Sequence, residues 1–314
     1  MFQHTFSSLP MEFHVAAVQV ATVWTNPESA REIDNLGTNN PTDIDGWLSS
    51  LSYQEKLAFC DENRIQTQLL YGESVLVTEV KGGWAKVLIP SQPSKKNKEG
   101  YPGWIPLKQL KKVSREEWFQ AVFAAVKEKH AWIENEAGEK FVEISYMTCL
   151  PVLNHEGDRV LVKTPEGSGY LHREAVELFQ VELGAEKGNG TQIIEAGKQF
   201  LDLDYIWGGM SSFGYDCSGF AYAMHKANGY QIPRDATDQA DYGVEIPEDQ
   251  LLPGDLLFFA YQEGKGKLHH VGLYYGDGKM LHSPQTGKGI EITVIKGTKY
   301  ERELCIARRY WERS

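Results

Sequence analysis

The sequence lacks a long apolar run. No stretch approaches the roughly 20 apolar residues that a membrane-spanning helix needs, so we expect no membrane segment. Residues 1–10 are largely polar and do not form the basic start and apolar run of a signal peptide. We therefore expect a cytoplasmic protein. The alternative is an exported protein whose signal was removed before this numbering begins.

Basic residues are also in deficit. The 314-residue chain has 32 Lys and Arg against 43 Asp and Glu, a formal net charge of −11. This balance argues against binding to a phosphate backbone and against an electrostatic membrane-binding patch. We expect neither nucleic acid nor membrane among the partners of this protein.

Cysteines are few and widely spaced, which excludes a disulfide framework and the C-x-x-C spacing of a zinc site. The four positions are Cys60, Cys149, Cys217 and Cys305. A zinc site formed by Cys217, His270 and His282 is conceivable, but no two of these ligands lie close together on one element. We expect no metal and no other cofactor.

Cys217 stands at a predicted helix start. Glycines interrupt residues 205–214, and apolar residues then recur at helical spacing over 220–227. Asp216 can cap this helix, and the dipole and free N–H groups of its first turn can lower a thiol pKa. A thiolate there would be a nucleophile with an oxyanion site beside it. The alternative is a structural cysteine between helix and sheet.

Two histidines downstream could serve such a nucleophile. His270 opens an alternating run, and His282 follows the turn at 276–278, so both are predicted on strands of one hairpin. His269 would point to the opposite face of its strand. A lone strand histidine is more often a half-exposed sheet residue. Two of them after a helix-start cysteine favour catalysis, since a nucleophilic cysteine needs a base and an orienting group.

The hairpin register decides whether the histidines can meet. A two-residue turn would pair His282 with Leu273, whereas a three-residue turn would pair it with Tyr274. Only the second register puts His270 and His282 on one face, and a bulge or strong coiling is still needed to bring them together.

The region from about 190 to 312 resembles the NlpC-type cell-wall cysteine peptidases. The Asp-Cys-Ser-Gly-Phe and His-Val-Gly motifs are specific in combination, and the other matching pieces fall in the family's order. The pieces are Tyr205-Ile-Trp-Gly-Gly, Asp216-Cys-Ser-Gly-Phe, Pro233-Arg, Pro253-Gly-Asp-Leu, His270-Val-Gly-Leu-Tyr and Leu281-His.

This resemblance implies an α+β fold with a papain-like catalytic domain, and cleavage of the γ-D-glutamyl–diamino acid bond in peptidoglycan stem peptides. By motif, Cys217 is the nucleophile, His270 the base and His282 the orienting third residue, while Tyr205 helps to line the oxyanion site. A papain-like acyltransferase, which would use the same thiolate, is an alternative. A catalytically silent wall-binding module is another.

The N-terminal half is predicted to contain two small β domains. Short strands with glycine turns between 67 and 106 make a small barrel that resembles a bacterial SH3-like domain, with a helical insertion that starts at Ser52. A second, more divergent barrel follows. The expected domains are 1–113, 114–183 and the catalytic domain 184–314, which opens with a linker and a helix capped by Thr191.

Three local matches resemble a subgroup in which the SH3-like domains close the cleft and select short peptides with a free N-terminal L-Ala. Glu73, Tyr101 and Asp235 would hold the ammonium group, a sensible task for two carboxylates and a tyrosine. Asp216, Ser218 and Ala236 are also expected to bind substrate. The alternative for Glu73 is a solvated turn residue.

The expected function is therefore a γ-D-glutamyl-L-diamino acid endopeptidase of murein peptide recycling, acting on stem peptides as a monomer. A wall-anchored hydrolase that acts on intact murein is the alternative that keeps the same chemistry. The sequence leaves open whether the diamino acid is meso-diaminopimelate or lysine.

Overall fold

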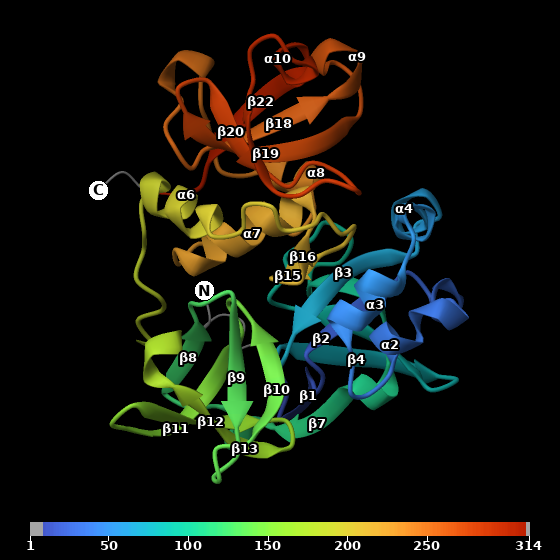
Figure 1. The fold of residues 1–314 in the computed structure, drawn as a ribbon, viewed down its shortest axis with the longest axis vertical. Coiled ribbons are helices and arrows are strands. Elements are labelled where there is room, and N and C mark those ends of the chain that lie inside the picture. The colour runs from blue at the N-terminus through green and yellow to red at the C-terminus, as the bar shows by residue number, and fades with distance from the viewer. Residues whose placement is uncertain (1–8, 312–314) are drawn as a thin grey trace. The chain divides into compact units, whose positions relative to one another are not determined.

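The computed structural model describes residues 9–311, which form two compact units (Figure 1). The N-terminal unit extends to Ala185, apart from residues 92–95, and also includes 210–213. The C-terminal unit holds 92–95, 186–209 and the chain from 214 onward. Most of the polar N-terminal segment considered above lies outside the described residues. Within 9–311, no helix is long and apolar enough to cross a membrane.

The first sheet of the N-terminal unit has seven strands in the order β3-β2-β6-β5-β4-β1-β7. Neighbouring strands pair antiparallel, and the inward-facing residues are mostly Val, Ile, Leu and Ala, as alternation predicts. The strands are β1 (Glu12–Ala16), β2 (Val20–Trp24), β3 (Ile65–Leu70), β4 (Ser74–Lys81), β5 (Trp84–Ile89), β6 (Tyr101–Pro106) and β7 (Leu110–Ser114).

A helical insertion lies between β2 and β3. Ser52 and Glu55 form the predicted capping box at the start of its last helix. Trp47 anchors the insertion, because its buried ring packs on Trp24 and its indole N–H donates to Asp34. The insertion contains η1 (Pro27–Ser29), η2 (Glu32–Asp34), α2 (Asn35–Thr38), α3 (Ile44–Ser50) and α4 (Tyr53–Asp61).

The second sheet repeats the topology of the first. Its order, β10-β9-β13-β12-β11-β8-β14, corresponds strand for strand to that of the first sheet when β8 is matched to β1. This correspondence supports the internal repeat expected from the sequence. The strands are β8 (Val122–Val126), β9 (His130–Glu134), β10 (Lys140–Ser145), β11 (Cys149–Glu156), β12 (Arg159–Thr164), β13 (Gly167–His172) and β14 (Val176–Gln180).

Apolar packing joins the two sheets into one unit. Phe13 and Val15 of β1 share a buried cluster with Phe123 of β8, and Trp118 lies in the same cluster. Trp118 ends the short helix α5 (Arg115–Trp118), which Ser114 caps. The short pieces of this unit are η3 (Leu107–Gln109), η4 (Arg173–Ala175) and β15 (Met210–Ser211).

The C-terminal unit is built on a six-stranded sheet in the order β17-β22-β18-β19-β20-β21. The helices α6 and α7 pack on each other, and α7 also packs against β19 (Figure 1). The strands are β16 (Gly214–Tyr215), β17 (Val244–Glu245), β18 (Leu256–Ala260), β19 (Leu268–Gly276), β20 (Lys279–His282), β21 (Glu291–Val294) and β22 (Leu304–Arg309). The helices are α6 (Gly190–Lys198), α7 (Cys217–Ala227), α8 (Ala236–Asp241), η5 (Glu248–Gln250), α9 (Tyr261–Gly264) and α10 (Lys299–Glu303).

One local prediction is wrong. The cap of α6 is Asn189 and not Thr191, because Asn189 forms a capping box with Gln192. The predicted domain boundaries at 113 and 183 stay predictions.

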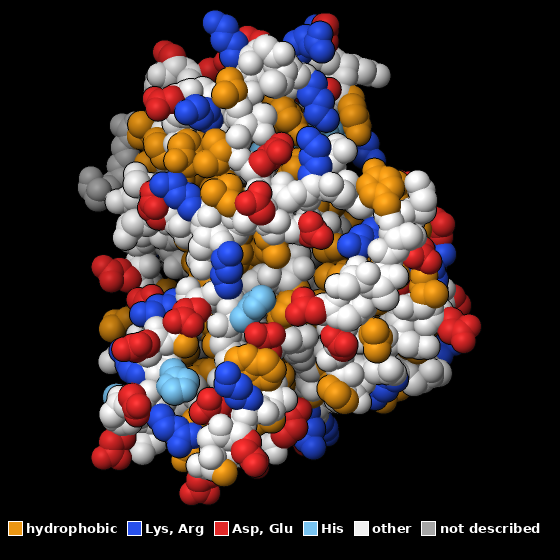
Figure 2. Space-filling view, viewed as in Figure 1, with side chains coloured by type: hydrophobic (Ala, Val, Ile, Leu, Met, Phe, Trp, Pro, Cys, Tyr) orange, Lys and Arg blue, Asp and Glu red, His pale blue; other side chains and the backbone are white. Residues whose placement is uncertain are grey.

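Acidic and basic side chains are interspersed over the face of the molecule shown in Figure 2.

Candidate active site

Cys217 is the first residue of α7, as predicted, and Asp216 is the cap. One carboxylate oxygen of Asp216 accepts the Gly219 N–H at 2.7 Å, and the other accepts the Gly208 N–H at 2.9 Å. A single carboxylate therefore ties the start of the helix to the turn that follows Tyr205. This arrangement fixes Cys217 relative to that turn.

Arg234 binds the side chains at this helix start. Its guanidinium contacts the two carboxylate oxygens of Asp216 at 2.7 and 3.1 Å and the Ser218 hydroxyl at 2.8 Å. Arg234 is 1% exposed, so the ion pair is buried. The side chains of Asp216 and Ser218 thus organise the helix start, while their predicted contact with substrate stays a prediction. The sequence analysis noted the Pro-Arg motif but assigned Arg234 no role.

His270 and His282 are in direct contact. Nε2 of His270 lies 2.8 Å from Nδ1 of His282, and both side chains are buried. The Cys217 thiol interacts with the backbone N–H of Val271, the residue that follows His270 on β19. The start of α7 and the hairpin β19–β20 therefore bring the predicted nucleophile and both histidines to one place.

The hairpin uses a two-residue turn, but a bulge changes its register. Gly276 pairs with Lys279, whereas Leu273 pairs with Leu281, so His282 lies opposite Gly272. Neither register considered above is therefore correct, although the bulge that they required is present. A Cβ built on Gly272 would lie 3.2 Å from Cβ of His282. Glycine at this position leaves room for His282 to reach His270.

A second contact holds the far side of His282. Its Nε2 lies 3.0 Å from the Thr293 hydroxyl on β21, and that hydroxyl donates to Glu291 at 3.1 Å. Tyr300 packs its ring against both histidines. None of these three residues was predicted from the sequence. Thr293 and Glu291 alternate along one strand face, but only the register of β20 against β21 shows that they reach His282.

Burial keeps the site uncharged at rest. It raises the pKa of the Cys217 thiol to about 12, a direction that the neighbouring Asp216 carboxylate reinforces. Burial also lowers the pKa of His270 well below its ordinary value and lowers that of His282 to about 3. The expectation of a lowered thiol pKa at the helix start is therefore wrong, because burial is the largest influence on this pKa.

The rings of His269 and His270 stack with their centroids 6.4 Å apart at a bulge in β19, so the expectation that they point to opposite faces is wrong. His269 stacks on Tyr261 and lies 3.2 Å from the Glu303 carboxylate. His225, in α7, is buried and contacts the Ala221 carbonyl at 2.8 Å. Both have structural partners of their own.

Tyr205 is buried, and its backbone N–H donates to the Lys288 carbonyl at 2.9 Å. It lies in the turn that Asp216 holds through Gly208, so its backbone is fixed relative to Cys217. Its part in the oxyanion site stays a prediction.

The residues expected to bind the substrate amino group are divided between the units. In the N-terminal unit, Glu73 accepts the Leu70 N–H at 3.0 Å and a hydrogen bond from Ser91. In the C-terminal unit, Asp235 precedes α8 but makes no side-chain cap to it, and Ala236 is the first residue of that helix.

The Tyr101 hydroxyl already has a cationic neighbour. The Lys96 ammonium contacts this hydroxyl and lies 4.2 Å from the centroid of the Tyr101 ring. The phenol face of Tyr101 therefore accepts an ammonium group within its own unit.

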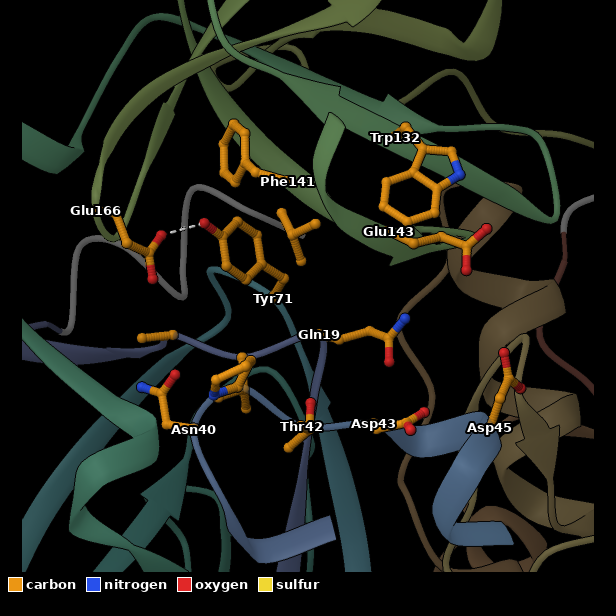
Figure 3. A pocket seen from close by; sticks show the side chains of 14 residues that line it. Gln19, Asn40, Thr42, Asp43, Asp45, Tyr71, Trp132, Phe141, Glu143 and Glu166 are labelled. Atoms are coloured by element: carbon orange, nitrogen blue, oxygen red, sulfur yellow. Dashed lines mark hydrogen bonds between the residues drawn. The ribbon is translucent and has the colours of Figure 1, made fainter. Parts of the chain in front are cut away.

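The N-terminal unit contains a cavity of about 410 Å³, shown in Figure 3. Tyr71, Trp132 and Phe141 line it together with several carboxylates, of which Glu166 bonds the Tyr71 hydroxyl. Its lining includes no cysteine and no histidine, so it offers no nucleophile–base pair. Across residues 9–311, no cluster of three or more His, Cys, Asp or Glu side chains could hold a metal ion.

A helix-start cysteine beside a buried histidine pair on an antiparallel sheet defines a papain-like cysteine peptidase. The comparisons specify the kind. Residues 202–309 match the NlpC/P60 family, 61–110 match the bacterial dipeptidyl-peptidase Sh3 domain and 126–179 match the YKFC SH3b2 domain. The chain belongs to the NlpC/P60 family of cysteine peptidases, and two SH3b domains precede its catalytic domain.

Two relatives match over nearly the whole chain. The γ-D-glutamyl-L-lysine dipeptidyl-peptidase of Bacillus subtilis (strain 168) is 47% identical, over 94% of this chain and 98% of its own length. The protein of the same name from Bacillus cereus (strain ATCC 10987) is 39% identical. That match covers 93% of this chain and 89% of the relative's own length.

A crystal structure shares the fold. It is that of an NlpC/P60 family protein from Bacillus cereus ATCC 10987 at 1.79 Å resolution, with a TM-score of 0.91 and 38% identity. The match covers 96% of this chain and all of that one. The α+β fold class and the predicted subgroup are confirmed.

Proposed function

We propose that this peptidase removes the dipeptide L-Ala-γ-D-Glu from the free N-terminus of murein stem peptides by hydrolysing the γ-D-glutamyl–diamino acid bond. The observation that carries the proposal is the helix-start Cys217 beside the bonded pair of His270 and His282. Two relatives that match nearly the whole chain are named for this bond, with lysine as the diamino acid, and as dipeptidyl-peptidases.

In the proposed mechanism, the Cys217 thiol gives its proton to His270 as its sulfur attacks the γ-carbonyl of D-Glu. The carbonyl oxygen becomes an oxyanion, which the Cys217 N–H at the start of α7 can stabilise, since the first N–H groups of a helix have no acceptor within the helix. Tyr205 is proposed to help here. His270 then protonates the leaving amine of the diamino acid as the C–N bond breaks, which leaves a thioester on Cys217.

Water completes the cycle. His270 takes a proton from water, the hydroxide attacks the thioester carbonyl, and Cys217 leaves as the thiol that His270 reprotonates. His282 orients His270 in both halves. Since burial raises the thiol pKa, the first proton transfer accompanies attack on the bound substrate and does not precede binding.

We propose that selection for a free amino terminus comes from Glu73, Tyr101 and Asp235, two carboxylates and a phenol that suit an ammonium group. Asp216, Ser218 and Ala236 are proposed to contact the rest of the peptide.

The direct test is product analysis. The full-length protein is incubated with L-Ala-γ-D-Glu-L-Lys and with its meso-diaminopimelate analogue, and products are identified by mass spectrometry. We expect the wild-type enzyme to release free diamino acid and the intact dipeptide L-Ala-γ-D-Glu. We expect Cys217→Ala to release neither product. Dipeptide attached to an added amine, without hydrolysis, would indicate an acyltransferase. Efficient release of peptides from intact sacculi would indicate a wall hydrolase.

A free amino-terminus requirement suits peptides that have already been cut from the wall. We therefore propose a cytoplasmic, monomeric enzyme of murein peptide recycling. Cell fractionation with an antibody and light scattering of the purified protein check these two points. Recovery in the wall fraction, or a stable dimer, would contradict them.

A further inference from the structure

His282 is bonded at both ring nitrogens. Nδ1 lies 2.8 Å from Nε2 of His270, and Nε2 lies 3.0 Å from the hydroxyl oxygen of Thr293. A neutral imidazole carries one N–H, so one nitrogen donates and the other accepts. Because burial lowers the pKa of both histidines, both are neutral near pH 7 and their tautomers matter.

Glu291 sets the direction of the chain of hydrogen bonds. A carboxylate can only accept, so the Thr293 hydroxyl donates to Glu291 and its oxygen accepts from His282. His282 therefore carries its proton on Nε2, and its Nδ1 accepts. His270 must then donate from Nε2, which leaves its Nδ1 unprotonated. Nδ1 is the nitrogen of His270 that can take the thiol proton.

We propose that Thr293 and Glu291 are positioning residues that lock His270 and His282 in the tautomers needed to deprotonate Cys217. This proposal rests on the cysteine mechanism of the proposed function but is independent of which peptide bond is cut. Without the hydrogen bonds from His282 to Thr293 and from Thr293 to Glu291, His282 can carry its proton on Nδ1. His270 then becomes the acceptor at Nε2 and has no free nitrogen for the thiol.

The sheet register supports a built arrangement. On β21, Glu291 pairs with His282 and Thr293 pairs with Met280, so the two residues share one face beside the histidine. A second contact reinforces the first, since a Glu291 oxygen lies 3.6 Å from Nε2 of His282. The Glu291 side chain is 42% exposed, so it lies on the outer side of this network.

The first test compares Thr293→Val with Thr293→Ser in the full-length enzyme. Valine keeps the shape of the side chain and loses the hydroxyl, whereas serine keeps the hydroxyl. We expect Thr293→Val to lower kcat about tenfold or more with little change in KM, and Thr293→Ser to stay within about threefold of wild type. The kcat of Glu291→Gln should fall between those of the two Thr293 variants. The glutamine amide can donate to Thr293 as well as accept from it, so it can reverse the direction of the hydrogen bonds.

The second test needs no peptide substrate. Selective ¹⁵N labelling of histidine imidazoles reports the tautomers of His270 and His282, and the rate of Cys217 alkylation by iodoacetamide reports deprotonation of the thiol. We expect Nε2–H tautomers for both rings in wild type and a mixed population, with slower alkylation, in Thr293→Val. If peptide cleavage fails in wild type while these results hold, only the proposed substrate is wrong.

The matched control is Glu303→Gln. It removes a carboxylate from His269, whose ring lies beside that of His270 but outside the chain of hydrogen bonds from Glu291 to His270. In Glu303→Gln, the histidine tautomers and the rate of Cys217 alkylation should match those of the wild-type enzyme. If Thr293→Val folds poorly, the tautomers and the alkylation rate of Glu291→Gln test the proposal instead. Unchanged tautomers and rates in the Thr293→Val and Glu291→Gln variants would overturn the proposal.

Discussion

The two units differ in how completely they bury their ion pairs. In the N-terminal unit, Asp34 is buried but its partner Arg31 is 18% exposed. The C-terminal unit buries the ion pairs Arg234–Asp216 and Arg309–Asp255 along with its histidines. The cores of the two N-terminal sheets are mainly aliphatic, and Glu73, the carboxylate proposed for recognition there, is only partly buried. Chemistry requires titratable groups held out of water, whereas recognition of a soluble peptide requires carboxylates that it can reach.

The largest effect is expected in the catalytic unit. Cys217→Ala should lower kcat by about 10⁶ and leave the fold intact, because no other group can supply the nucleophile. His270→Ala should be nearly as severe. His282→Ala should be milder, since an orienting group contributes less. Steady-state kinetics and circular dichroism of the three variants check this order.

Equal losses for His270→Ala and His282→Ala would show that His282 does more than orient its neighbour. Substantial activity in Cys217→Ala would rule out the cysteine mechanism. A chelator should leave wild-type activity unchanged and iodoacetamide should abolish it. The opposite pair of results would place the cysteine and histidines in a metal site.

The next effect concerns acid stability. Burial lowers the pKa of His225 to about 4 and of His282 to about 3, and it also lowers that of His270 well below its ordinary value. In the unfolded chain these imidazoles protonate near pH 6.5, so below that pH the unfolded state binds more protons and stability falls. At pH 5 the expected loss is about 2 kcal/mol for each of His225 and His282.

Urea denaturation of the full chain at pH 7.5 and pH 5 measures this loss. His225→Phe should make stability less dependent on pH, since it removes one buried histidine from outside the catalytic pair. Equal stability at the two pH values would mean that these histidines are protonated in the folded protein.

A smaller effect is expected for the buried cap. Arg234→Met leaves the Asp216 carboxylate buried without its partner, which should lower the free energy of unfolding by about 3–5 kcal/mol. The matched control is Lys112→Met in the N-terminal unit. Its ion pair with Glu12 is mostly exposed, so the loss should be within about 1 kcal/mol. Similar losses in the free energy of unfolding for Arg234→Met and Lys112→Met would show that burial of the ion pair does not distinguish the two units.

The sequence predicted the elements that carry the chemistry more securely than their contacts. The helix start at Cys217 and its Asp216 cap follow from local signals and are confirmed. The hairpin register was wrong, because a bulge between Tyr274 and Gly276 has no clear sequence signature. The thiol pKa was also misjudged, since burial depends on packing that no local pattern shows.

Residues that act over long separations in the sequence were the hardest to find. Arg234 is 18 positions from the Asp216 that it holds, and Thr293 is 11 from His282. Neither spacing belongs to a helix or a hairpin turn. Gly272 was visible in the His-Val-Gly motif, but its purpose appears only when His282 is placed opposite it.

The most direct measurement of the central claim compares L-Ala-γ-D-Glu-L-Lys with the same peptide acetylated at its N-terminus. Acetylation removes the ammonium charge, and losing a charge-assisted contact while carboxylates stay unpaired should lower kcat/KM at least about a hundredfold. Glu73→Gln should narrow this ratio by slowing only the free peptide. Comparable rates on both peptides in the wild-type enzyme would contradict the account.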